Sequence, residues 1–274
     1  MALFTDSSIS DVQDLINYES NLVDVADAEG IDLETKITLA QSELGAELGV
    51  AALRPGNIYW IGPSWNSTGA EINLSRFDPG QVVVTSPLKL WHTFQTLAIV
   101  YRDAYNRKLN DKYLPKWNEY KELARWASNL LYQTGIGVAM QPLPKPKQPA
   151  LDWVSGTLAA MTVYVQMSWT NLAGTAEGGP SDEIAVGVPA NQALRVTPPA
   201  VPASPPAPAL PYAIAGWNVY VGGASGAGTR QNPQPLALGQ PWVMPATGMT
   251  AGTPVGSGQQ PDFFRTVPRF VQRG

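Results

Sequence analysis

The residue of this sequence best suited to acid–base catalysis is its only histidine, His92. An imidazole titrates near neutral pH, which makes histidine the most frequent general base in enzymes. His92 lies between Trp91 and Thr93 in a segment with helical periodicity, and the sequence offers it no evident catalytic partner. We therefore interpret His92 as a packing or surface residue.

The other residue types that bind metals or act as nucleophiles give no stronger pattern. The chain has no cysteine, which excludes thiolate nucleophiles and zinc–thiolate sites, and a single histidine excludes a His-rich metal site. Acid pairs can be selected from 22 Asp and Glu, but those between Asp11 and Glu34 lie where helix starts and a turn would place them.

Short catalytic and nucleotide-binding motifs are also missing. We find no phosphate-binding loop, dinucleotide fingerprint, nucleophile elbow or calcium loop. The glycine-rich residues 222–228 follow a predicted strand but lead to no helix, so we interpret them as a hairpin loop. The sequence therefore predicts no catalytic residue, no cofactor and no metal site, and we expect a protein that is not an enzyme.

The charges of the chain are unevenly distributed. Residues 1–50 contain eleven acids and one lysine, whereas residues 89–125 contain eight lysines and arginines and four acids. Two interpretations stay open: solvated helix faces of opposite sign, or complementary surfaces through which copies or neighbouring proteins meet. Aromatic residues between the basic ones, such as Tyr101 and Trp117, could bind nucleic acid, but their helical spacing and the net charge of −4 favour a place in the core.

Helical periodicity dominates residues 1–140. We expect one helix from Ser8 or Ser10 to Gly30, a second over about 32–48, a third over about 88–109 and a fourth over about 114–134. Glycine and proline interrupt this pattern over residues 54–86, where we expect an inserted loop or hairpin. Four helices in this length predict an antiparallel helical bundle.

Composition changes after about residue 140, because 20 of the 25 prolines lie from Pro142 onward. Prolines at nearly every second position of residues 141–150 predict a semi-rigid linker. Residues 151–260 contain short alternating runs separated by turns, of which residues 162–170 are the clearest. This pattern predicts an immunoglobulin-like β-sandwich, so the expected fold class is multidomain, α then β.

The last segment, residues 261–274, is predicted to be an extended C-terminal tail. Its aromatic residues alternate with arginines and are poorly suited to solvent. We therefore take six of them as candidate contacts with a partner protein: Phe263, Phe264, Arg265, Arg269, Phe270 and Arg273. The prolines at positions 261 and 268 favour binding in an extended form or as an added strand.

The N-terminal sequence gives no indication of export or of membrane insertion. The first 22 residues lack the basic region and apolar core of a signal peptide, and no run of 18 apolar residues occurs. We therefore expect synthesis inside a cell and no contact with a membrane.

Several segments of residues 1–140 resemble neck proteins of tailed bacteriophages, the head-to-tail adaptor or connector class. The likeness is carried by residues 3–6 (LFTD), 29–33 (EGIDL), 91–105 (WHTFQTLAIVYRDAY) and 117–123 (WNEYKEL). It implies a structural virion protein, made in the host cytoplasm, that forms a ring, commonly of twelve copies. Such a ring joins the portal protein to the downstream tail or nozzle protein and continues the channel through which genomic DNA passes as cargo.

Segments of the second half resemble the immunoglobulin- or fibronectin-like domains often appended to phage structural proteins. They are residues 164–169 (YVQMSW), 179–181 (GPS) and 216–220 (GWNVY). This resemblance implies an appendage that faces outward from the ring.

Two functional hypotheses follow from these observations. In the adaptor hypothesis Asp24 and Asp27 are candidate channel-facing acids, which would repel DNA weakly and let it slide. In the alternative, the chain is a carbohydrate-binding or host-surface adhesion protein of the virion. Four tryptophans would then stack on sugars, unless they pack in the core: Trp153, Trp169, Trp217 and Trp242.

Overall fold

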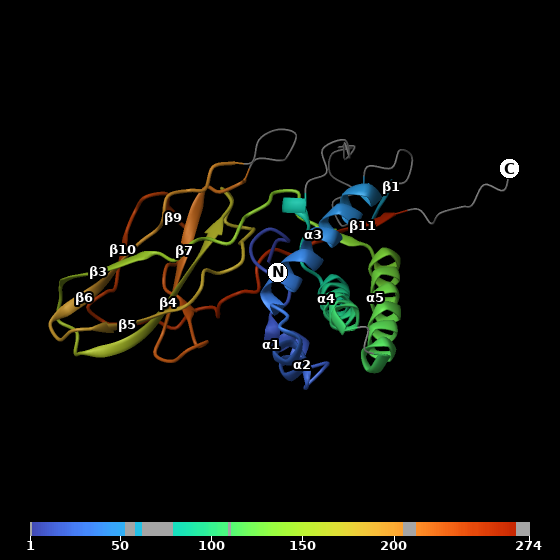
Figure 1. Cartoon of the computed structure of the whole chain (residues 1–274). Helices are drawn as coiled ribbons and strands as arrows, with labels where there is room; N and C mark the ends of the chain where they lie inside the picture. The colour runs from blue at the N-terminus through green and yellow to red at the C-terminus, as the bar shows by residue number, and fades with distance from the viewer. Residues whose placement is uncertain (1, 53–57, 62–78, 109–110, 205–211, 267–274) are drawn as a thin grey trace. The chain divides into compact units, whose positions relative to one another are not determined.

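The computed structural model describes residues 2–52, 58–61, 79–108, 111–204 and 212–266 of the chain (Figure 1). The chain divides into two compact units. The first, which we call the β unit, comprises Met1–Asp6 and Met140–Gln260. The second, the helical unit, comprises Ser7–Ala139 and Pro261–Gly274. The backbone therefore passes from one unit to the other three times.

The described residues of the helical unit form five α-helices that precede the strands of the β unit, so the expected order of α then β is confirmed. They are α1 (Val12–Ile16), α2 (Leu22–Glu29), α3 (Leu33–Ala52), α4 (Ser86–Lys108) and α5 (Leu114–Thr134). The short 3-10 turns η3 (Pro79–Gln81) and η4 (Asp111–Tyr113) precede α4 and α5. Pro87 and Pro115 lie in the first turns of these two helices, where an amide hydrogen would have no partner within the helix.

The single helix expected from Ser8 or Ser10 to Gly30 is wrong, because the structure divides this stretch into α1 and α2. Asp11 begins α1 through a reciprocal cap: its carboxylate accepts a hydrogen bond from the backbone N–H of Asp14, and its own backbone N–H donates to the Asp14 carboxylate. Gly30 ends α2 as expected, with a left-handed φ of 61°.

Helix α4 is the centre of the helical unit, since it packs against α5, α3 and the two N-terminal helices (Figure 1). Its contact with α5 is aromatic: ring centroids lie 5.6 Å apart for Tyr101 and Tyr120, and 5.8 Å apart for Tyr105 and Trp117. Tyr101 is buried. The interpretation as core is therefore confirmed for Tyr101, whereas Tyr105 and Trp117 are half-buried at the edge of this contact.

A small antiparallel sheet in the helical unit has the order β1 (Ile58–Ile61), β11 (Asp262–Thr266), β2 (Ile136–Val138). The middle strand comes from the predicted tail and forms four residue pairs with β1 and three with β2. Pro261 passes very close to Gly137, where an added Cβ would lie 2.9 Å from the proline Cβ. The first part of the tail is therefore a structural strand, and residues 267–274 lie outside the described residues.

The strands described in the β unit form two antiparallel sheets. One has the order β10 (Trp242–Val243), β6 (Gln192–Thr197), β3 (Ala150–Ser155). The other has the order β5 (Ile184–Val188), β4 (Met161–Thr170), β7 (Gly216–Gly222), β8 (Thr229–Arg230), and β9 (Leu236–Ala237) also pairs with β7. The strand expected at residues 162–170 is confirmed as β4, and the other short strands expected between turns of residues 151–260 include β5, β6 and β7.

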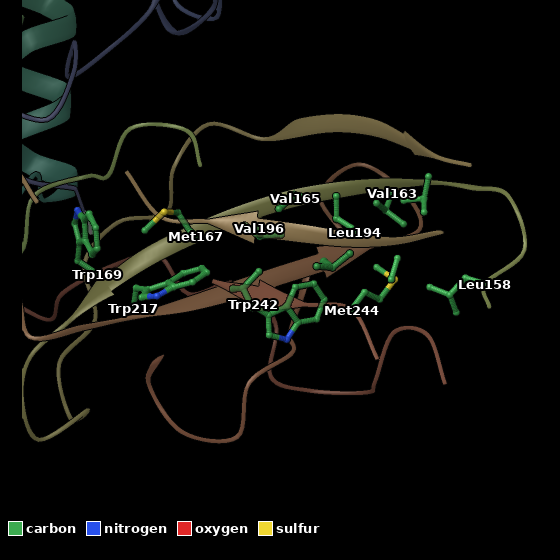
Figure 2. Close-up of a cluster of buried hydrophobic side chains, with 14 of the residues drawn as sticks. Leu158, Val163, Val165, Met167, Trp169, Leu194, Val196, Trp217, Trp242 and Met244 are labelled. Carbon is green, nitrogen blue, oxygen red and sulfur yellow. The ribbon is translucent and has the colours of Figure 1, made fainter. Parts of the chain in front are cut away.

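Side chains from both sheets gather in one apolar core (Figure 2). Val163, Val165, Met167 and Trp169 alternate along β4 and all belong to this core, as their spacing predicts. Leu194 and Val196 join them from β6, and Trp217 joins them from β7. The alternation of apolar residues is thus what brings the two sheets together.

The proline-rich stretch expected to be a linker belongs to the β unit. Leu143 lies in the apolar core, and its backbone N–H donates to Oε1 of Gln259 at 2.8 Å. The N–H of Lys145 donates to the Asp6 carboxylate at 2.7 Å, which ties the first residues of the chain to the same unit. Because prolines cannot donate, the few amides between them carry the hydrogen bonds of this segment.

Candidate interaction surfaces

His92 has a partner that the sequence did not reveal. Its Nε2 lies 3.1 Å from the carbonyl oxygen of Ile37, and its Nδ1 lies 2.5 Å from Oγ of Ser10. A carbonyl can only accept, so Nε2 carries the proton and Nδ1 accepts from the serine hydroxyl. His92 thereby joins α4 to α3 and to the segment before α1.

This serine–histidine pair is built as a structural contact. His92 is 0% exposed and Ser10 is 1% exposed. The serine hydroxyl is therefore closed to both substrate and water. Burial lowers the pKa of His92 from 6.5 to about 4, against smaller opposing effects of the hydrogen bond to the Ile37 carbonyl and of the Asp14 charge. A base so weak is poorly suited to activating serine near neutral pH.

The lowered pKa gives a testable pH dependence. The unfolded chain binds a proton on His92 below about pH 6.5, whereas the folded chain does so only near pH 4. The free energy of unfolding therefore decreases as the pH is lowered from about 6.5 to about 4. The full loss is about 3 kcal/mol. We expect the change in unfolding free energy between pH 7 and pH 4, measured in urea, to shrink by this amount in the His92→Asn variant. Equal losses in both proteins would contradict it.

Opposite charges of the helical unit meet within the chain. Lys89 lies 2.8 Å from Asp14, and Lys116 lies 2.9 Å from Glu19. Lys36, the single base among the first 50 residues, lies 2.8 Å from Asp103. Part of the complementarity that suggested contacts between copies is therefore used to fold the unit.

The two candidate channel-facing acids lie on α2. Asp24 and Asp27 are both exposed, three residues apart, on the side of the helix opposite to buried Leu22 and Ala26. Their carboxylates are thus available to solvent or to a partner.

The candidate contact residues of the tail fall in two groups. Phe263, Phe264 and Arg265 belong to β11, where Phe263 is 37% exposed. Phe264 pairs with Ile136 of β2 on one side and Trp60 of β1 on the other. The remaining three, Arg269, Phe270 and Arg273, lie outside the described residues.

Three of the four tryptophans considered as sugar platforms are buried in the β core. Trp169, Trp217 and Trp242 all belong to it (Figure 2). Only Trp153 is half exposed, at 50%, and its indole N–H donates to the carbonyl of Gly187 at 3.2 Å. A stacking surface made of all four rings is therefore excluded.

A cavity of about 490 Å³ lies at one end of the β unit. It is lined by Met140, Gln141, Asn171, Leu172, Ala173, Tyr212 and Ala213. The Asn171 side chain is occupied by the backbone N–H groups of Thr175 and Ala176, which it holds in a turn. The lining contains no acid, lysine, arginine or histidine that could orient a charged ligand.

The described part of the chain contains no group of three His, Asp or Glu side chains arranged to hold a metal ion. None of its helices combines the length and the apolar character needed to cross a bilayer.

Comparison of the chain with models of known protein families, with curated proteins and with solved structures found no match.

Proposed function

We propose that the chain is a structural virion protein that forms a head-to-tail adaptor ring, joining a portal protein to the downstream tail or nozzle protein. The proposal starts from the resemblance of residues 1–140 to phage neck proteins. The observation that best supports it is the return of β11 to the helical unit. Residues 267–274, which follow β11, are thereby attached to the unit that would build the ring. The ring would hold twelve copies and lie in the virion neck.

We further propose that the β unit has an immunoglobulin-like fold. In that fold the second strand pairs with the fifth in one sheet, while in the other sheet the third pairs with the sixth and the sixth with the seventh. The pairs β3–β6 and β4–β7–β8 follow the same pattern, and β5 beside β4 takes the place of the extra strand that variable-type domains add to this sheet. One departure is β10, a late strand that takes the place next to β6.

The exposed acids and the tail have separate roles in this proposal. Asp24 and Asp27 would face the channel, where their charge repels the DNA backbone and keeps passing DNA from adhering. Residues 267–274, which follow β11 and carry Arg269, Phe270 and Arg273, would contact the portal. The protein would act without catalysis and without a cofactor.

Deletion of residues 267–274 tests the portal contact without removing β11. We expect this variant to keep the thermal stability of the full chain and to bind the portal protein at least tenfold more weakly, since apolar and arginine anchors dominate most interfaces. Co-sedimentation with portal rings measures the affinity. The triple variant Arg269→Ala, Phe270→Ala, Arg273→Ala is the matched control for chain length, and unchanged binding by both would contradict this role.

A further inference from the structure

Strand β5 forms an open edge of its sheet. Among the described strands it pairs only with β4, in a register that runs without a bulge from Met161 opposite Val188 to Val165 opposite Ile184. Hydrogen-bonded and non-hydrogen-bonded pairs alternate along such a ladder, so only every second residue of β5 bonds to β4. The other residues direct their backbone N–H and C=O groups away from the sheet.

The hydrogen bonds of β4 identify the residues of β5 that point outward. The backbone N–H of Met167 donates to Oγ of Ser181 at 3.1 Å, and the N–H of Ser181 donates to the Met167 carbonyl at 2.7 Å. The odd-numbered residues of β4 therefore bond toward the β5 side, where their partners are Ile184, Val186 and Val188. The outward backbone groups of β5 thus belong to Ala185 and Gly187.

This edge lacks the usual protection against an added strand. Sheet edges are commonly protected by a charge, a proline or a bulge within the strand, yet β5 consists of Ile-Ala-Val-Gly-Val. Glu183 and Pro189 only flank the strand, and the Glu183 carboxylate accepts the N–H of Gly226 at 2.9 Å. Ala185 and Gly187 are exposed. A strand of this composition and exposure tends to pair with another chain.

Trp153 of β3 covers the edge from the facing sheet. It lies opposite Leu194 in the β3–β6 ladder, and Leu194 belongs to the apolar core, so the Trp153 side chain leaves β3 on the inner side. Its indole N–H donates to the outward carbonyl of Gly187 at 3.2 Å. No other hydrogen bond between described residues reaches the outward backbone groups of Ala185 and Gly187. The indole therefore occupies the position that the N–H of an added strand would take.

From this contact we infer that Trp153 protects β5 against strand addition and so keeps the β unit from pairing with other copies of the chain. A second β5 is the strand that fits the edge once the indole is removed. In an antiparallel pair centred on Val186, Ala185 of one copy bonds to Gly187 of the other, and Ile184 lies opposite Val188. These side chains are all small or β-branched, and no like charges meet across the pair.

Replacement of Trp153 by alanine in the full chain tests the inference. We expect this variant to self-associate at least tenfold more strongly than the wild type in sedimentation equilibrium, because the whole outward edge of β5 is then free. Trp126→Ala is the matched control, since Trp126 is 52% exposed on α5 and Trp153 is 50% exposed. Unchanged self-association of Trp153→Ala, or an equal increase in Trp126→Ala, would overturn the proposal.

A second substitution separates pairing through β5 from general unfolding. In the Trp153→Ala background, Gly187→Lys adds a charge at the edge, and a Cβ at this position meets nothing within 4 Å. We expect the double variant to return to the self-association of the wild type, although it lacks the same indole. A double variant that associates as strongly as Trp153→Ala would contradict the inference. The inference is independent of the proposed ring, because it concerns the β unit rather than the helices that would build the ring.

Discussion

Removal of residues 261–274 is expected to destabilise the helical unit more than any single substitution. The truncation takes away β11, the middle strand of the sheet, and with it four residue pairs to β1 and three to β2. Each lost hydrogen bond costs about 1 kcal/mol, and β1 and β2 are left with unpaired edges, so the total loss should exceed about 4 kcal/mol. Urea unfolding followed by far-UV circular dichroism measures it.

The matched control is the shorter deletion of residues 267–274, which keeps the whole strand. The two truncations should differ strongly in stability. If they unfold at the same urea concentration, β11 contributes little, and the tail acts only as a partner-binding segment. The comparison also separates folding from the proposed portal binding, because a protein that lacks residues 261–274 could fail to bind either through unfolding or through loss of the contact residues.

Replacement of Trp217 by alanine is expected to cost about 3–5 kcal/mol, the usual loss for a large aromatic residue in a core. Trp217 is fully buried between the two sheets of the β unit. Trp153→Ala is the matched control: its ring is half exposed, so its loss should cost only about 1–2 kcal/mol. Urea unfolding of both variants provides the measurement.

If Trp217→Ala stays as stable as Trp153→Ala, the packing in Figure 2 does not hold the sheets together.

A sugar-binding role predicts a result that concerns retention rather than stability. Retention of the wild-type chain on a host polysaccharide, lost in Trp153→Ala alone, would support adhesion through that single exposed ring. We expect no difference in retention between wild type and Trp153→Ala.

The sequence predicted the helix limits and the strand β4 because residues adjacent in sequence determine them. Proline at the start of α4 and α5 and glycine at the end of α2 marked helix limits that the structure has within a few residues. Strict alternation along β4 predicted both the strand and the face that Val163 and Met167 bury. These features require only neighbours in sequence, which is why a single chain reveals them.

Contacts between distant residues were beyond the sequence. Ser10 looks like a helix cap, yet the cap is Asp11, and the serine hydroxyl serves His92, 82 positions later. The strand β11 looks like a free tail because its partners, residues 58–61 and 136–138, lie far away in the chain. The proline content of residues 141–150 suggested a spacer, but Leu143 of this stretch lies in the apolar core of the β unit. Composition alone does not reveal such a contact. No local pattern distinguishes these outcomes.

The adaptor proposal is tested most directly by the mass of the assembly. Native mass spectrometry of the full chain alone, and then with the portal protein of the same genome, gives the number of copies in each state. The proposal predicts a small species alone and a closed ring of twelve copies on the portal, continued by the tail protein. Separate masses for the chain and the portal, at concentrations where portal rings are intact, would contradict it.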